Sequence, residues 1–245
     1  MDASNTTLRC WATLDGVAIR CVYKPVAGER PLWDFPDGTL AGREVAAYLV
    51  STFLATVDPA WELVPPTVHR DGPLGPGACQ LWVEEASEPL VGFVPEERLP
   101  ADWHPIAAAR DDDGHPYLLA HADDPRLARM AIFDEVVNNA DRKGGHVLVA
   151  GDGQVYGVDH GLCFNLAPKL RTVLWGWADQ PLPDWADPVL ASLEKAVAGS
   201  LGEELAAHLT RQEVAALAQR VRDLRTRGRF ATPNPDGPAV PWPPI

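Results

Sequence analysis

Lysine is scarce in this sequence, and that scarcity makes the position of each lysine informative. Only four of the 21 basic residues are lysines, at positions 24, 143, 169 and 195, and the other 17 are arginines. The 34 acidic residues leave a formal net charge of −13 at pH 7. We expect no general nucleic-acid binding, because that function needs a basic surface that releases counterions.

Long apolar runs and paired cysteines are also missing. We find no run near the 18 or so residues of a membrane span and no signal peptide at the N-terminus. With the net charge of −13 and no basic amphipathic helix, stable membrane association is not expected. The cysteines at positions 10, 21, 79 and 163 form no C-x-x-C pair. This favours reduced thiols in a cytoplasmic protein.

The 245 residues, 46% of them apolar, suffice for one large domain or two small lobes with a core. Residues 8–14 and 17–23 are predicted strands, and Asp15-Gly16 between them favours a primed hairpin turn. Apolar residues at helical spacing predict a helix over 40–54, with Arg43, Glu44 and Ser51 off its apolar face. With extended pieces near 63–69 and a strand over 78–84, residues 1–84 form a predicted β-rich lobe.

The rest of the chain is predicted to be mainly helical. Residues 85–124 are interrupted by proline and are interpreted as a hinge and irregular connector, with a solvated acidic turn at 111–113 rather than a calcium loop. A C-terminal lobe is predicted over 125–230. Residues 231–245, with six prolines, are expected to form an extended or disordered tail. The predicted fold class is therefore α+β.

Further signals refine this lobe. Asp124 is a predicted helix N-cap, followed by proline at the first helical position. Two short strands are expected near 146–149 and 154–158. Capping-box spacing at 200–203 and 210–213 predicts two more helix starts.

Two acids flank the second pair of predicted strands. Asp141 precedes the pair and Asp159 follows it, with His146 entering the first strand. Carboxylate oxygens beside an imidazole suit Mg²⁺ or Mn²⁺. The alternative is that both acids are solvated turn residues.

The spacing of these residues favours a phosphoryl-transfer site. Sites of the kinase type use a loop acid, a metal ligand about five residues later, and a second acid before glycine. Asp141, His146 and Asp159-His160-Gly161 occur in that order. The kinase pattern also needs a lysine ending a strand and a glutamate in the next helix, and Lys24 and Glu44 occupy such positions.

On these segments, and on residues 169–177, the sequence resembles the phosphatidylinositol 3-/4-kinase-like family, specifically a small bacterial branch of the atypical protein/lipid kinase superfamily. The resemblance covers roughly residues 4–210 and implies a two-lobed protein-kinase-like fold that binds ATP with Mg²⁺ or Mn²⁺. It implies that Lys24 holds the α/β-phosphates and that Glu44 fixes Lys24. It also implies that Asp141 orients or deprotonates the acceptor hydroxyl and that Asp159 holds the metal with His146. Ser4, Asn5 and Thr6 fall at the phosphate-covering loop, and Gln80, Val83 and Glu84 fall at the hinge that meets adenine.

Other positions stay open. Lys143 either meets the γ-phosphate or is a solvated loop lysine. Lys169 and Arg171 either bind an anionic acceptor or are solvated. Trp175 and Trp177 are expected to anchor their loop on the core, and His160 is assigned no role.

Two departures from the family pattern matter. The family's D-R-H-x-x-N becomes D-R-K-x-x-H, so the imidazole of His146 replaces a neutral amide, which favours Mn²⁺ or a weakened second metal site. The N-terminus before the first strand is short, which leaves the phosphate loop incomplete or without a strand. We predict a kinase whose hydroxyl acceptor is a protein or a small metabolite. The alternatives are a nucleotide-binding pseudokinase and a metal-dependent hydrolase that uses Asp141, His146 and Asp159 without Lys24.

Overall fold

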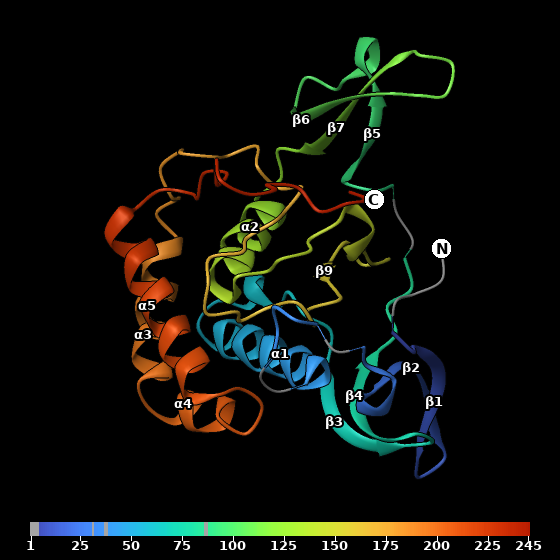
Figure 1. Cartoon of the computed structure of the whole chain (residues 1–245), viewed down its shortest axis with the longest axis vertical. Helices are drawn as coiled ribbons and strands as arrows, with labels where there is room; N and C mark the ends of the chain where they lie inside the picture. Colours follow the sequence, from blue (N-terminus) through green and yellow to red (C-terminus); the bar gives the residue numbers. More distant parts are fainter. Residues whose placement is uncertain (1–4, 31, 37–38, 86–87) are drawn as a thin grey trace.

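A computed structural model describes residues 5–30, 32–36, 39–85 and 88–245 of this α+β protein (Figure 1). Its first sheet is antiparallel, with the strand order β1-β2-β4-β3. The bounds are β1 Leu8–Leu14, β2 Val17–Pro25, β3 Thr67–Gly72 and β4 Gly75–Leu81. The predicted β1–β2 hairpin is confirmed: Leu14 pairs with Val17, and Asp15 and Gly16 have φ angles of 50° and 81°. Two positive φ angles define a primed turn, whose twist matches the flanking strands.

Helix α1 (Leu40–Val57) follows as predicted and is capped twice at its start. The Thr39 side chain accepts a hydrogen bond from the Gly42 N–H, and the Glu29 carboxylate accepts from the N–H groups of Leu40 and Ala41. These bonds satisfy backbone donors that have no partner within the helix.

Helix α1 packs on both sides, against β3 and β4 of the first sheet and against α3 and α4 (Figure 1). Ten of its residues are therefore buried, among them Arg43, Glu44 and Ser51, which lie off the predicted apolar face. The helix has 18 residues and a mean hydropathy of 1.2, enough by length and composition to cross a membrane, and 56% of it is buried inside the protein. A buried core helix passes the same test, so α1 is weak evidence for a membrane span.

Residues 85–124 were expected to be irregular, and this expectation is wrong. Within them lies a three-stranded antiparallel sheet, ordered β5-β7-β6, that projects from one end of the molecule (Figure 1). Its strands are β5 Val91–Pro95, β6 Trp103–Arg110 and β7 Pro116–Ala122. The prolines that suggested loops occupy positions a sheet tolerates: strand ends at Pro95 and Pro116, and a bulge on the edge strand at Pro105. The acidic turn at 111–113 joins β6 to β7 and is exposed, as predicted.

The remaining elements are α2, a short two-stranded sheet and three helices. Their bounds are α2 Pro125–Val137, β8 Val147–Val149, β9 Val155–Gly157, α3 Ala186–Val197, α4 Ser200–Leu205 and α5 Arg211–Arg227. Single turns of 3-10 helix occur at Val26–Gly28, Pro59–Trp61, Glu96–Arg98 and Gly144–His146.

Three predicted helix starts are confirmed, and two of them have the predicted side-chain cap. The Asp124 side chain accepts from the Arg126 N–H, and Thr210 and Glu213 form a reciprocal capping box. At α4, however, Gly199 is the N-cap and makes no side-chain bond, so the capping box predicted at 200–203 does not form.

Residues 231–245 form neither helix nor strand, as expected, but they are packed rather than disordered. The carbonyl of Ala239 accepts hydrogen bonds from the backbone N–H of Thr172 and from the indole N–H of Trp175. The carbonyl of Pro244 accepts from the Gly144 N–H. The tail therefore lies along two loops that come from elsewhere in the chain.

Candidate active site

Lys24 connects three separate parts of the fold. It lies near the end of β2, and its ammonium forms an ion pair with Glu44 of α1 and another, at 2.8 Å, with Oδ1 of Asp159, which follows β9. The Glu44 side chain is 3% exposed, whereas that of Asp159 is 52% exposed. The ion pair expected between Lys24 and Glu44 is thus present, and Asp159 joins it.

These contacts shift the pKa values of Lys24 and Asp159. Burial lowers the pKa of Lys24, but the two carboxylates outweigh it and raise the pKa above the usual value. Loss of solvent opposes ionisation of Asp159, but the Lys24 ammonium outweighs this and holds the pKa of Asp159 well below its usual range. At neutral pH, Lys24 is therefore a cation and Asp159 an anion.

Asp159 is held by its backbone as well. Its φ of 62° lies in the left-handed region, which aspartate tolerates better than most residues. The N–H of the next residue, His160, donates to Oε2 of Glu44 at 3.0 Å, while Oε1 of Glu44 faces Lys24. Glu44 thus orients both Lys24 and the segment that carries Asp159.

His146 lies beside Asp159. Its Nε2 is 3.5 Å from Oδ2 of Asp159, and the side chain is 16% exposed. Burial lowers the pKa of His146 to about 4, so its ring is neutral at pH 7 and has a lone pair to offer. Its Nδ1 is buried and has no hydrogen-bond partner among the described residues. One imidazole nitrogen and one carboxylate on the same side of the site fit a divalent cation.

Asp141 and Lys143 lie on the loop between α2 and β8. Nζ of Lys143 is 3.5 Å from Oδ2 of Asp141, and the Asp141 N–H donates to Oδ1 of Asn139. Burial raises the pKa of Asp141, and Lys143 only partly counters this effect. Asp141 is therefore a better proton acceptor than a fully solvated aspartate.

Arg142, between those two residues, connects several segments of the site through its guanidinium group. It is fully buried and forms a two-pronged ion pair with Asp134 of α2, with Nε at 2.9 Å and NH2 at 2.8 Å from the carboxylate oxygens. NH1 donates to the carbonyls of His146 and Val158, and NH2 also donates to Nε2 of His160. All the guanidinium N–H donors therefore have acceptors. The contacts link α2, the Asp141 loop and both strands of the β8–β9 hairpin to the segment after it.

The supporting residues were not singled out from the sequence. Asn139 bridges Asp134 and the Asp141 N–H, and Asn138 ends α2 with a φ of 54°. The Asn138 side chain donates to the carbonyls of residues 165 and 167 and accepts from the Lys169 N–H. An Asn-Asn pair directly after a predicted helix was the available signal, since asparagine favours the left-handed cap position. His160, to which no role was given, accepts from Arg142 and thereby helps to position the loop.

Two adjoining cavities meet at this cluster. One has a volume of about 460 Å³ and the other about 490 Å³, and both are lined by Thr7, Lys24 and Asp159. The first, here called the hinge cavity, is also lined by residues 80–85 and His146. The second, here called the loop cavity, is also lined by Asn5, Thr6, Glu44, Asp141, Lys143 and Pro243. Of the predicted site residues, only Ser4 is not placed, since it lies outside the described residues.

Several predicted nucleotide-binding residues already use polar groups in bonds within the protein. Oδ1 of Asn5 accepts from the Arg30 N–H, and the Thr6 N–H donates to the Gly28 carbonyl. Gln80 is 5% exposed, and its Nε2 donates to Thr67. These residues therefore line the cavities with polar groups that already have a partner.

The segment after Gly161 lies beside a third cavity, of about 680 Å³, lined by Lys169, Arg171, α5 and the tail. Lys169 is not a freely solvated lysine, because its Nζ is 2.9 Å from Oδ2 of Asp34. Trp177 anchors its segment on the core as expected: it is buried there, donates to Asp123 and packs on His121. Trp175 instead donates to the Ala239 carbonyl of the tail.

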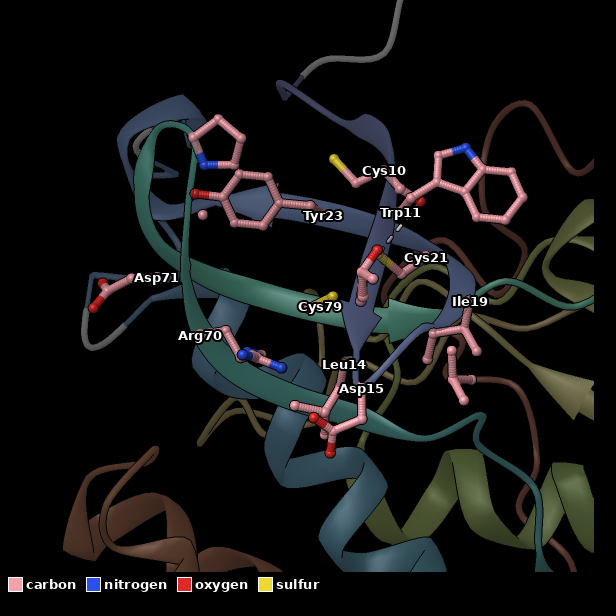
Figure 2. A pocket seen from close by; sticks show the side chains of 15 residues that line it. Cys10, Trp11, Leu14, Asp15, Ile19, Cys21, Tyr23, Arg70, Asp71 and Cys79 are labelled. Carbon is pink, nitrogen blue, oxygen red and sulfur yellow. Dashed lines mark hydrogen bonds between the residues drawn. The ribbon is translucent and has the colours of Figure 1, made fainter.

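Two further features contain none of the predicted site residues. Figure 2 shows a cavity of about 690 Å³ on the face of the first sheet, lined by the thiols of Cys10, Cys21 and Cys79 among others. The four cysteines are all free, in line with the expected reduced thiols. On the β6–β7 turn, ligand atoms of Asp111, Asp113 and His115 lie within 4.8 Å of one another, but all three residues are exposed. Exposure alone accounts for such a turn, so we assign no metal to it.

The chain is 51% identical over 251 residues to Protein Rv2133c of Mycobacterium tuberculosis, and this match covers 98% of the chain and 88% of that protein. No family model matches the sequence.

Proposed function

Because the chain belongs to the same family as Protein Rv2133c, whose name states no activity, we propose a function from the site itself: an ATP-dependent phosphotransferase of the atypical kinase type. In this proposal residues 5–84 and the helical part of the chain act as two kinase-like lobes. ATP lies in the two adjoining cavities between them, and the γ-phosphoryl group passes to a hydroxyl acceptor.

The observation that carries the proposal is the cluster of Lys24, Glu44 and Asp159. A cation that is shared between a buried carboxylate and an exposed one is suited to exchange the exposed partner for phosphate oxygens, while the buried partner keeps it in place. Glu44 is the buried partner and Asp159 the exposed one. Charge-assisted contacts of this kind are about twice as strong as neutral hydrogen bonds.

The other residues take roles that follow from their places. His146 and Asp159 would hold Mg²⁺ or Mn²⁺, and the neutral imidazole favours Mn²⁺. The cation, when bound, neutralises charge on the phosphates. Asp141 would align or deprotonate the acceptor hydroxyl, and Lys143 would meet the γ-phosphate in the loop cavity. Catalysis would then consist of positioning and charge neutralisation.

The cellular setting is part of the proposal. ATP as substrate and four free cysteines both suit a cytoplasmic protein. The net charge of −13 argues against nucleic-acid or anionic-membrane partners. The acceptor is a protein side chain or a small metabolite.

Labelled ATP tests this proposal. The purified protein is incubated with ATP and either Mg²⁺ or Mn²⁺, and autophosphorylation and ATP turnover are measured. We expect Asp141→Ala to lose turnover but keep ATP binding, and Lys24→Ala to lose turnover and to bind ATP more weakly. Lys195→Ala is the matched control, because Lys195 is an exposed residue of α3 outside both cavities.

The same experiment separates the alternatives. Turnover that persists in Lys24→Ala but requires Asp141 and Asp159 would indicate a metal-dependent hydrolase. Binding without turnover, in either metal and with a range of acceptors, would indicate a pseudokinase. If ATP with either metal fails to raise the melting temperature of the wild-type protein, both nucleotide-binding functions are wrong.

A further inference from the structure

Residues 239–245 reach the loop that carries Asp141. The Gly144 N–H, three residues after Asp141, donates to the Pro244 carbonyl at 2.8 Å. Further back, the Ala239 carbonyl accepts from Thr172 at 3.1 Å and from the Trp175 indole at 2.9 Å. The Arg142 backbone in turn pairs with residues 171 and 173. The Asp141 loop, the segment around Thr172 and residues 239–245 are thus joined by hydrogen bonds.

The close fit at Gly144 shows how tightly the segment sits on the loop. A Cβ atom on Gly144 would lie 2.3 Å from Cδ1 of Ile245 and 3.2 Å from Cγ1 of Val91. The neighbouring Gly145 has no such crowding, since the nearest atom to its added Cβ is 4.0 Å away. The segment is therefore seated on Gly144 itself, between the loop and β5.

The segment also forms part of the loop cavity. Pro243 lines that cavity together with Asp141, Lys143 and Asp159. None of residues 239–245 lines the hinge cavity. Trp242, next to Pro243, is 88% exposed. Its indole is therefore available for contact with another molecule.

We propose that residues 239–245 are a working part of the active site. They are positioning residues that hold the Asp141 loop through Gly144, and they supply the acceptor-side wall through Pro243. This inference rests on the proposed phosphotransferase function, and it assigns the acceptor to the loop cavity and the nucleotide base to the hinge cavity. Loss of the segment therefore impairs transfer rather than ATP binding.

Three variants test this assignment. One lacks residues 239–245. The second, Trp175→Phe, removes one indole donor to Ala239 and keeps an aromatic ring. The third, Trp177→Phe, is the matched control, because its lost donor bonds to Asp123 rather than to the segment. Hydrogen–deuterium exchange over residues 141–146, the dissociation constant for ATP with Mn²⁺, and kcat and KM for ATP turnover are measured for each.

In the deletion variant we expect exchange over 141–146 to rise at least about tenfold, kcat to fall at least about tenfold, and KM for ATP to stay within about twofold. Trp175→Phe should raise exchange and lower kcat by about two- to tenfold each, the effect of one hydrogen bond. Trp177→Phe should change neither.

Unchanged exchange and kcat in both the deletion and Trp175→Phe would overturn the assignment. Equal effects of Trp175→Phe and Trp177→Phe would overturn it as well, because they would reflect general loosening. If the deletion variant fails to fold, the two single substitutions still decide. If the wild-type protein binds no ATP, the proposed function fails, while the exchange comparison still shows whether the segment holds the loop.

Discussion

Removing the carboxylate of Asp134 is predicted to be among the most damaging single changes in the chain. Asp134 and Arg142 are both 0% exposed, and Asp134 accepts hydrogen bonds from Nε and NH2 of Arg142 and from Asn139. In Asp134→Ala, the guanidinium loses its counter-charge and two acceptors at a place where water does not reach. Leaving a buried charge unpaired costs about 3–5 kcal/mol of folding free energy.

The size of the effect on melting follows from the chain length. For domains of about 150–250 residues, 1 kcal/mol shifts the melting temperature by about 2–4 °C. Asp134→Ala should therefore melt about 6–20 °C below the wild-type protein. Calorimetry gives the melting temperature, and urea denaturation followed by circular dichroism gives the free energy of unfolding.

Asp187→Ala is the matched control. Asp187 also pairs with an arginine, Arg225, but its side chain is 64% exposed, and Arg225 keeps a second partner in Glu194. Exposed pairs contribute about 0–1 kcal/mol, so the control should melt within about 4 °C of wild type. A decrease for Asp134→Ala no larger than that for Asp187→Ala would refute the view that Arg142 depends on Asp134.

Two further predictions concern groups whose pKa is shifted by loss of solvent. Burial lowers the pKa of His121 from 6.5 to about 4. Between those pH values only the unfolded chain takes up the proton. The free energy of unfolding should therefore decrease by about 3 kcal/mol as the pH falls from 6.5 toward 4. Urea denaturation at several pH values should show this loss in the wild-type protein and in the control His115→Gln, whose histidine is exposed, but a smaller loss in His121→Gln. An equal dependence of stability on pH in all three proteins would contradict the assignment. Loss of solvent raises the pKa of the half-buried Cys79 thiol to about 12. Alkylation of Cys79 by iodoacetamide at pH 8, followed by mass spectrometry, should therefore be at least about 100-fold slower than that of a model thiol; a similar rate would contradict the raised pKa.

Local patterns in the sequence predicted several elements correctly. The primed turn at Asp15-Gly16 and the caps at Asp124 and Thr210 were found because each depends on a few adjacent residues. The order of Lys24, Glu44, Asp141, His146 and Asp159 was also readable, and the structure brings Lys24, Glu44, His146 and Asp159 into one cluster beside Asp141. Their roles in catalysis remain a prediction.

What could not be predicted depends on partners distant in the chain. Arg43 is buried because Glu213, 170 residues later, pairs with it, and no local pattern announces such a partner. The β5-β7-β6 sheet was missed because prolines usually mark loops, and only the finished sheet shows that they lie at strand ends and a bulge. The docking of residues 239–245 likewise depends on carbonyls that accept from N–H groups of the Asp141 loop and of Thr172.

The central claim is that Lys24, held by Glu44, binds the phosphates of ATP. The most direct test is calorimetric titration of ATP with Mn²⁺ into the wild-type protein, Lys24→Ala and the control Lys195→Ala. A charge-assisted hydrogen bond contributes about 1.5–3 kcal/mol, so Lys24→Ala should weaken ATP binding by about 10- to 150-fold, while Lys195→Ala should bind as wild type does. Equal affinity of Lys24→Ala and the wild-type protein for ATP would contradict the claim.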